Sequence, residues 1–119
     1  GGLEETVPQK DVFISTVMTL TSEELEEAKS PEFCSQSNYA YCTTNGDAYL
    51  YATKKCEAQG AHIPSSAEFM AYKNSGATIL YGPGNNYHLA DNYYWYGNWG
   101  SIQPNVRNSD NHKFICISN

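Results

Sequence analysis

Four cysteines constrain the fold of this 119-residue chain more than any other feature. They stand at positions Cys34, Cys42, Cys56 and Cys116. An even number of cysteines in a short chain predicts disulfide bridges in an oxidising compartment, and four cysteines allow three pairings. The alternative is a cytosolic protein whose thiols are reduced and buried. We favour bridges because Cys34 and Cys42 are too far apart for a CxxC metal motif, and no histidine lies near either residue.

Two of the cysteines lie in segments that are expected to be in the core. Cys56 belongs to the stretch 51–69, which has the pattern of a helix end, a glycine stop, an apolar turn and a second helix start. Cys116 lies in an alternating apolar segment, typical of a final core strand. A bridge between them would join the first core helix to this strand. Cys34 and Cys42 flank a polar segment of hairpin length, where a local bridge is sterically natural.

Capping signals predict where the helices begin. Thr21, followed three residues later by Glu24, has the capping-box pattern after a β-branched, strand-like run over residues 11–20. Ser30-Pro31 should end that helix, because proline disfavours the helical conformation of the residue before it.

Two further helices are expected in the middle of the chain. The first begins near Asp47 and ends at Gly60, with an apolar stripe at helical spacing. The stripe consists of Ala48, Tyr51, Ala52 and Cys56. The second helix follows Ser65, with Glu68 completing another capping box.

The net charge of −6 is confined to the N-terminal part of the chain. Eight of the 13 acidic residues and two of the seven basic residues fall within residues 1–32, whereas residues 33–119 are balanced. We therefore expect an acidic strand–helix or linker segment over 1–32 and a domain over 33–119. Without clustered Lys and Arg the surface is a poor nucleic-acid binder. No apolar run approaches the roughly 20 residues of a membrane span, so direct membrane insertion is not expected.

The segment between the second helix and the last strand has the composition of a binding loop. It combines aromatic residues (Tyr81, Tyr87, Tyr93, Tyr94, Trp95, Tyr96, Trp99) with asparagines (Asn85, Asn86, Asn92, Asn98, Asn105, Asn108, Asn111). Tyr and Trp supply rigid contact area and Asn supplies adaptable hydrogen bonds. Trp95, flanked by alternating tyrosines, is expected in the core. Trp99, beside Gly97 and Gly100, is expected as an exposed anchor.

The residues give little support to catalysis, and we expect no enzyme and no catalytic residue. The chain has no G-x-S-x-G, H-E-x-x-H or phosphate-cradling glycine motif. His62, His88 and His112 are scattered, and a His88–Asp91 pair is more often structural. His62 is expected to be a half-buried packing residue rather than a metal ligand.

An ordered set of motifs runs through residues 33–119. It comprises Ala52, Cys56, Gly60-Ala-His-Ile63, Ser65-Ser-Ala-Glu68, Tyr94-Trp-Tyr96 and Phe114-Ile-Cys116. This set resembles the C-type lectin-like domain. The resemblance implies an α+β fold with two helices, small antiparallel sheets and a long ligand loop region. It also implies the bridges Cys34–Cys42 and Cys56–Cys116, the first of them like the N-terminal bridge of longer family members.

The resemblance is to the bacterial versions of this fold, which lack the inner disulfide of the ligand loop. These are invasin- and intimin-like adhesins and the C-terminal domains of pilus-tip proteins. Their common Leu-Pro-Thr-X-X-Glu motif is similar to Ile63-Pro-Ser-Ser-Ala-Glu68. Hypervariable ligand-binding proteins of diversity-generating systems share the fold, with a variable stretch in the place of residues 85–111.

The family resemblance also bears on calcium. Gln103-Pro104-Asn105 is similar to the tripeptide with which calcium-dependent members bind sugar, whereas the tryptophan of their later Trp-Asn-Asp motif is missing. The implied ligands are Gln103, Asn105, Asp110 and Asn111. Calcium prefers several hard oxygen ligands, and only one of these four is a carboxylate. We therefore expect no cofactor, with calcium as the alternative.

The resemblance and the loop composition together imply an extracellular domain on a bacterial cell surface. Its expected partner is a glycan or protein receptor on a host or neighbouring cell, bound through loops 85–111. The expected contacts are Tyr87, Tyr96, Asn98, Trp99, Gln103, Asn105 and Arg107. The alternative functions are a structural role at a filament tip or in pilus assembly, including that of a minor pilin C-terminal domain, and hypervariable ligand binding. In either case the domain would belong to a larger surface protein or filament.

Overall fold

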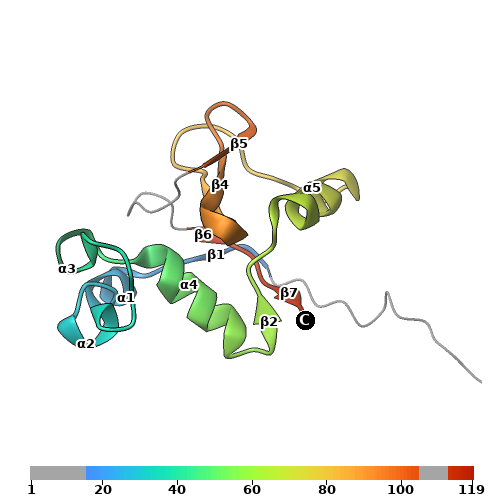
Figure 1. Cartoon of the computed structure of the whole chain (residues 1–119). Helices are drawn as coiled ribbons and strands as arrows, with labels where there is room; N and C mark the ends of the chain where they lie inside the picture. Colours follow the sequence, from blue (N-terminus) through green and yellow to red (C-terminus); the bar gives the residue numbers. More distant parts are fainter. Residues whose placement is uncertain (1–15, 105–112) are drawn as a thin grey trace, which may run out of the picture.

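The computed structural model describes residues 16–104 and 113–119 of the chain. These residues form a mixed α+β fold with a five-stranded sheet, a two-stranded sheet and two disulfide bridges (Figure 1).

The first two helices begin at caps that the sequence shows. Helix α1 covers Ser22–Glu27, and the predicted capping box is confirmed because Thr21 and Glu24 each accept the backbone N–H of the other. Helix α1 ends before Ser30, as predicted. Ser30 also begins a second helix, α2 at Pro31–Cys34, because its hydroxyl accepts a backbone N–H of that helix and proline suits the first helical position.

The bridge between Cys34 and Cys42 is confirmed, with the two Cα atoms 5.7 Å apart. The prediction of a hairpin here is wrong, because the bridge joins α2 to another short helix, α3 at Cys42–Asn45. Ser35 and Ser37 explain the difference. Their hydroxyls donate to Glu32 O and to the Asp47 carboxylate, so local side-chain bonds replace a strand ladder.

Helix α4, Ala48–Glu57, carries the predicted apolar stripe. Its N-cap is Asp47, whose carboxylate accepts the N–H of Leu50 at 3.0 Å. Ala48, Ala52 and Cys56 are buried and Tyr51 is half-buried. Gly60 ends this region with a φ of +72°, a backbone conformation that glycine adopts without steric cost.

Strand β2 and helix α5 follow. Strand β2, Ala61–His62, pairs antiparallel with β7, Ile117–Ser118, to form the two-stranded sheet. Helix α5 covers Ser66–Asn74, and its predicted capping box between Ser65 and Glu68 is confirmed.

The five-stranded sheet has the order β1-β6-β3-β4-β5. Its strands are β1 (Met18–Thr19), β3 (Tyr87–His88), β4 (Tyr93–Tyr96), β5 (Ser101–Pro104) and β6 (Lys113–Phe114), with a 3₁₀ turn, η3 (Ala90–Asn92), between β3 and β4. The expectation of purely antiparallel sheets needs correction, because β3 and β6 run parallel. Strand β6 does not pair with β5, which precedes it in the chain. It lies instead between β1 and β3.

The last strand is not continuous. Residues 114–117 are all buried, with exposures of 0 to 8%, and the predicted alternation is seen between two cores: Phe114 and Cys116 belong to one cluster and Ile115 to the other. The chain leaves the larger sheet after Phe114 and joins β2 at Ile117. Ile115 and Cys116 span the passage and contact different core clusters, and Cys116 forms the second confirmed bridge, to Cys56 on α4.

Residues of the N-terminal segment pack in the same hydrophobic core as residues of the expected domain over 33–119. Met18 pairs with Phe114, and Leu20 is buried against the alanines of α4. On the surface, Glu24 forms an ion pair with Lys55 of α4. The expected boundary between residues 32 and 33 therefore separates no structural unit within the described residues.

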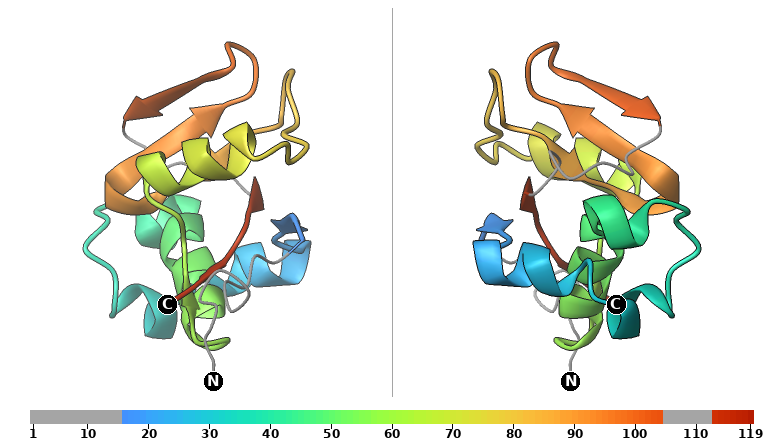
Figure 2. Two further views of the ribbon diagram at one scale, coloured as in Figure 1. Left: turned by 90° about the vertical axis from the view of Figure 1, so that its right-hand side faces the viewer. Right: turned by 90° about the vertical axis from the view of Figure 1, so that its left-hand side faces the viewer.

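Three core clusters lie within the described residues. Figure 2 shows the β4–β5 hairpin and α5 together at one end, with α1 and α2 at the other. The cluster at the hairpin end contains Phe69, Ile79, Tyr87, Leu89, Trp95 and Ile115. Of the helices that the structure describes, none is long and apolar enough to cross a membrane.

Candidate ligand-binding surface

The β4–β5 hairpin sorts its side chains onto two faces. The strands pair with Tyr94 opposite Gln103 and Tyr96 opposite Ser101. Because side chains alternate along a strand, these four residues share one face of the hairpin. Trp95 points to the other face, into the core.

Trp95 anchors the hairpin, as the sequence predicts. Its side chain is 1% exposed and its ring lies 5.5 Å from that of Phe69 on α5. The indole Nε1–H donates to Leu80 O at 3.2 Å. The same residue, Leu80, donates its N–H to the buried hydroxyl of Tyr87 at 3.3 Å. Two core side chains therefore hold the segment around residue 80 against the sheet.

The opposite face carries a row of aromatic rings, which we call the aromatic ladder: the half-buried Tyr94 and Tyr96 and the exposed Trp99. Ring centroids are 5.9 Å apart for Tyr94 and Tyr96 and 5.0 Å apart for Tyr96 and Trp99. Trp99 is 70% exposed, which confirms its predicted exposure. Beside the ladder, Gln103 Nε2–H donates to Ser101 Oγ at 2.9 Å, so polar groups flank the rings.

The turn that presents Trp99 is fastened to the loop before β3. Gly82 N–H donates to Gly97 O at 2.8 Å, and Gly97 N–H donates to Asn86 Oδ1 at 3.0 Å. Asn85 Nδ2–H donates to Tyr81 O at 2.6 Å. Any Cβ at position 97 would lie 2.2 Å from Asn85 O, so only glycine fits. The ladder is therefore held in place before any ligand arrives.

This arrangement assigns Asn85 and Asn86 a role that composition does not reveal. The Asn85 side chain bonds within the loop and the Asn86 side chain bonds to Gly97 of the hairpin turn, whereas the loop composition had suggested contacts with a ligand. Tyr81 is an exposed aromatic residue near this turn that the sequence analysis did not include among the expected contacts. It is 56% exposed, and its ring lies so close to Gly100 that a Cβ there would be 2.8 Å away. Tyr81 directly precedes the turn sequence Gly82-Pro83-Gly84, and this position could have predicted its exposure.

The structure brings together some of the predicted contact residues. Tyr96, Trp99 and Gln103 lie on or beside the ladder, and Asn98 is exposed in the same turn. Tyr87 is corrected: its side chain is 0% exposed, and burial raises the pKa of its hydroxyl. A ring in the core has no face for a ligand. Asn105, Arg107, Asp110 and Asn111, and with them most of the expected calcium ligands, lie outside the described residues.

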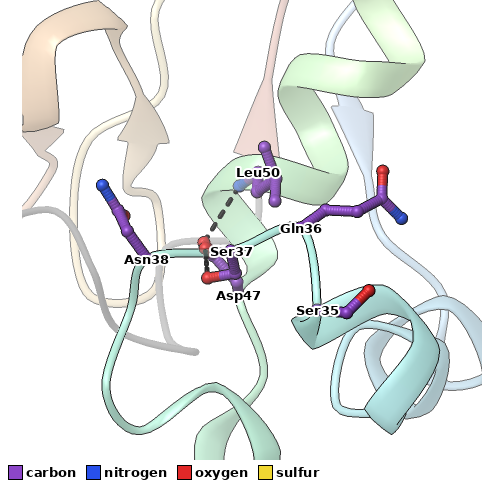
Figure 3. A pocket seen from close by; sticks show the side chains of 6 residues that line it. All are labelled: Ser35, Gln36, Ser37, Asn38, Asp47 and Leu50. Atoms are coloured by element: carbon purple, nitrogen blue, oxygen red, sulfur yellow. Dashed lines mark hydrogen bonds between the residues drawn. The ribbon is translucent and has the colours of Figure 1, made fainter.

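A polar hollow of about 320 Å³ lies between residues 35–38 of the disulfide loop and the start of α4 (Figure 3). It is lined by Ser35, Gln36, Ser37, Asn38, Asp47 and Leu50. The Asp47 carboxylate, in a residue that is 1% exposed, accepts the Ser37 hydroxyl at 2.6 Å and the Leu50 N–H at 3.0 Å. The buried charge thus serves to cap α4, and we assign no ligand to this hollow.

His62 joins three elements of the fold. Its Nε2 lies 3.0 Å from Glu68 Oε2 on α5, and its Nδ1 lies 2.7 Å from Asn119 Oδ1, beyond β7. The hydrogen bond to Glu68 raises the pKa of His62. Burial pushes the pKa of Glu68 upward, but hydrogen bonds from Ser65 N–H and His62 outweigh it, and the pKa is lowered. His62 is half-buried, as predicted, but its role as an ion-pair partner was missed.

This ion pair makes a small part of the stability depend on pH. A raised His62 pKa contributes stability that is complete below the unfolded pKa and is lost as pH rises through the folded pKa. Glu68 works in the opposite sense, losing its contribution as pH falls through its own lowered pKa. Partly exposed pairs of this kind contribute about 0.2–1 kcal/mol. We expect the stability difference between wild type and His62→Gln, measured by urea unfolding, to shrink between pH 5.5 and pH 8. A constant difference would contradict the assignment.

Among residues 16–104 and 113–119, no three His, Cys, Asp or Glu side chains gather as a metal site would require. Searches with the chain against models of protein families, against curated proteins and against solved structures find no match. The chain's own residues are therefore what identify its candidate site: the aromatic ladder on the β4–β5 hairpin.

Proposed function

We propose that this chain is an extracellular binding domain of the C-type lectin-like type, which recognises a receptor on a host or neighbouring cell through the aromatic ladder. The observation that carries the proposal is the exposure of Trp99, at 70%, on a turn fastened by backbone hydrogen bonds. Trp and Tyr are enriched among the residues that dominate the energetics of interfaces, so an exposed tryptophan on a fixed turn suits contact with a partner.

Rigidity of the turn supports a binding role. The hydrogen bonds of Gly82, Gly97 and Asn86 hold the ladder in one conformation, so a ligand has little ordering entropy to overcome. The flanking hydroxyl of Ser101 and amide of Gln103 can pair with the polar groups of a sugar or a peptide. This combination of rigid aromatic rings and adaptable polar groups is that of antibody-type binding loops.

The bridges and helices support the proposed family and compartment. The Cys56–Cys116 bridge joins the first long helix to the closing segment, and a second helix with a Ser-X-X-Glu start follows, as the resemblance implies. Disulfides persist mainly in oxidising compartments, which favours an extracellular location. Placement in a larger bacterial surface protein or filament is part of the same proposal.

Substitution of Trp99 by alanine tests this function. We expect at least a roughly 30-fold loss of affinity, the effect of removing an interface hot spot. Binding would be measured by a glycan array and by flow cytometry on host and bacterial cells, with calcium and with chelator. Tyr41→Ala is the matched control, because Tyr41 is 64% exposed on the disulfide loop, outside the ladder. Unchanged binding by a folded Trp99→Ala variant would refute the proposal.

Self-assembly is the second candidate function. Leu80 at 39%, Tyr81 at 56% and Trp99 at 70% exposure place several large apolar side chains on the surface at the hairpin end. Apolar patches of this kind also mark contacts between subunits, as in a filament tip or pilus. Concentration-dependent oligomers by light scattering, abolished in Trp99→Ala, would favour assembly over receptor binding.

A further inference from the structure

A second pocket lies between helices α1, α2 and α4, and none of its lining residues belongs to the aromatic ladder. It has a volume of about 290 Å³ and is lined by Glu27, Phe33, Tyr51, Lys54, Lys55 and Ala58. Tyr51, Lys54 and Lys55 of α4 and its C-cap residue Ala58 recur at helical spacing and so share one face of that helix. Nothing in the proposed receptor-binding function uses this pocket.

Two aromatic rings provide apolar walls. The rings of Phe33 and Tyr51 are 5.3 Å apart and inclined by 41°. Phe33 is only 8% exposed, so its position is fixed by the core beneath it. Small-molecule sites are typically apolar concavities with a few polar groups, and this volume is near the lower end of their range of about 300–1,000 Å³.

Some of the charged side chains around the pocket have a bonding partner in the structure and one has none among the described residues. Lys55 forms an ion pair with Glu24, and Glu27 Oε1 accepts the hydroxyl of Tyr51 at 3.0 Å. Burial, together with Glu27, raises the pKa of Tyr51 to about 12, so this hydroxyl remains a donor at physiological pH. Among the residues that the structure describes, Lys54 forms no hydrogen bond or ion pair, even with Glu57 one turn further along α4.

We propose that this pocket binds a small organic monocarboxylate, with its apolar body against Phe33 and Tyr51 and its carboxylate paired with Lys54. Charge complementarity selects the anion, since Lys54 is the lining cation that has no partner among the described residues. Glu27 keeps its negative charge while it accepts the Tyr51 hydroxyl, but two lysines and only this one carboxylate line the pocket, which disfavours an amine. The small volume restricts the body to about the size of one aromatic ring with a short chain.

Titration with 3-phenylpropanoate, followed by ¹H–¹⁵N NMR of the whole chain, tests the proposal. We expect shifts centred on the pocket and an affinity roughly two- to fivefold above that of the uncharged 3-phenylpropanamide, the range for a partly exposed ion pair. Lys54→Gln should abolish that preference. Lys73→Gln, in the last turn of α5, is the matched control and should retain it.

A second variant tests the location of the binding site without changing any charge. Ala58 is exposed at the pocket and has ordinary helical dihedrals, so Ala58→Phe should fold and fill the space. It should abolish binding of both compounds. Equal affinity for the amide, preference for 3-phenylpropylamine, or an absence of shifts at the solubility limit would each overturn the proposal.

Discussion

Replacing both Cys56 and Cys116 by alanine is expected to lower the free energy of unfolding by about 4 kcal/mol. The bridge closes a loop with a sequence separation of 60 residues, and the chain-entropy model relates stabilisation to the logarithm of loop length. Both cysteines are 0% exposed, so the bridge also holds α4 against the segment between β6 and β7. Domains of this size have a total stability of only about 5–15 kcal/mol.

Removal of the other bridge provides the matched control. Cys34 and Cys42 are separated by eight residues, and the same model predicts a smaller loss of about 2.5 kcal/mol for their double alanine variant. Guanidinium unfolding of the two variants and the wild type measures both effects. A larger loss from the short bridge would show that loop entropy does not govern the stability of this fold.

Trp95→Ala is the single substitution with the largest expected effect, a loss of about 3–5 kcal/mol. The indole is 1% exposed and packs against Phe69 at 5.5 Å and Tyr81 at 5.4 Å. Its removal creates a cavity and leaves Leu80 O without its side-chain donor. The segment around residue 80 should loosen, and the turn of Trp99 with it.

The chain contains the ideal comparison, because it has one buried and one exposed tryptophan. Trp99→Ala should change the free energy of unfolding by less than about 0.5 kcal/mol, as surface substitutions do. Guanidinium unfolding monitored by circular dichroism would measure both variants without depending on tryptophan fluorescence. Similar losses from the two substitutions would mean that Trp99 is part of the core and not available to a ligand.

Local features of the fold could be predicted from the sequence. The capping boxes of Thr21 with Glu24 and Ser65 with Glu68 each form between residues three positions apart. The stripe of α4 follows from helical periodicity alone. The exposure of Trp99 followed from its neighbouring glycines, because a turn carries its side chains on the surface. All of these depend on interactions within a few residues of the chain.

Other features required the distant parts of the chain to be in place. Tyr87 and Tyr96 both belong to the aromatic segment 81–99, but Tyr87 is buried against Phe69 of α5, whereas Tyr96 is half-buried beside Trp99. Lys54 and Lys55 are neighbours in sequence, but within the described part of the chain only Lys55 has a carboxylate partner, Glu24 of α1.

The sequence by itself thus determined the starts of α1, α4 and α5, the cysteine-rich framework and the aromatic character of the hairpin, because short-range hydrogen bonds and periodicity decide them. Only the tertiary structure decided which tyrosines remain exposed, which asparagines hold the loop, and that β6 lies parallel to β3. Those outcomes depend on contacts between residues that lie far apart in the sequence, and a local sequence pattern does not determine which segments form these contacts.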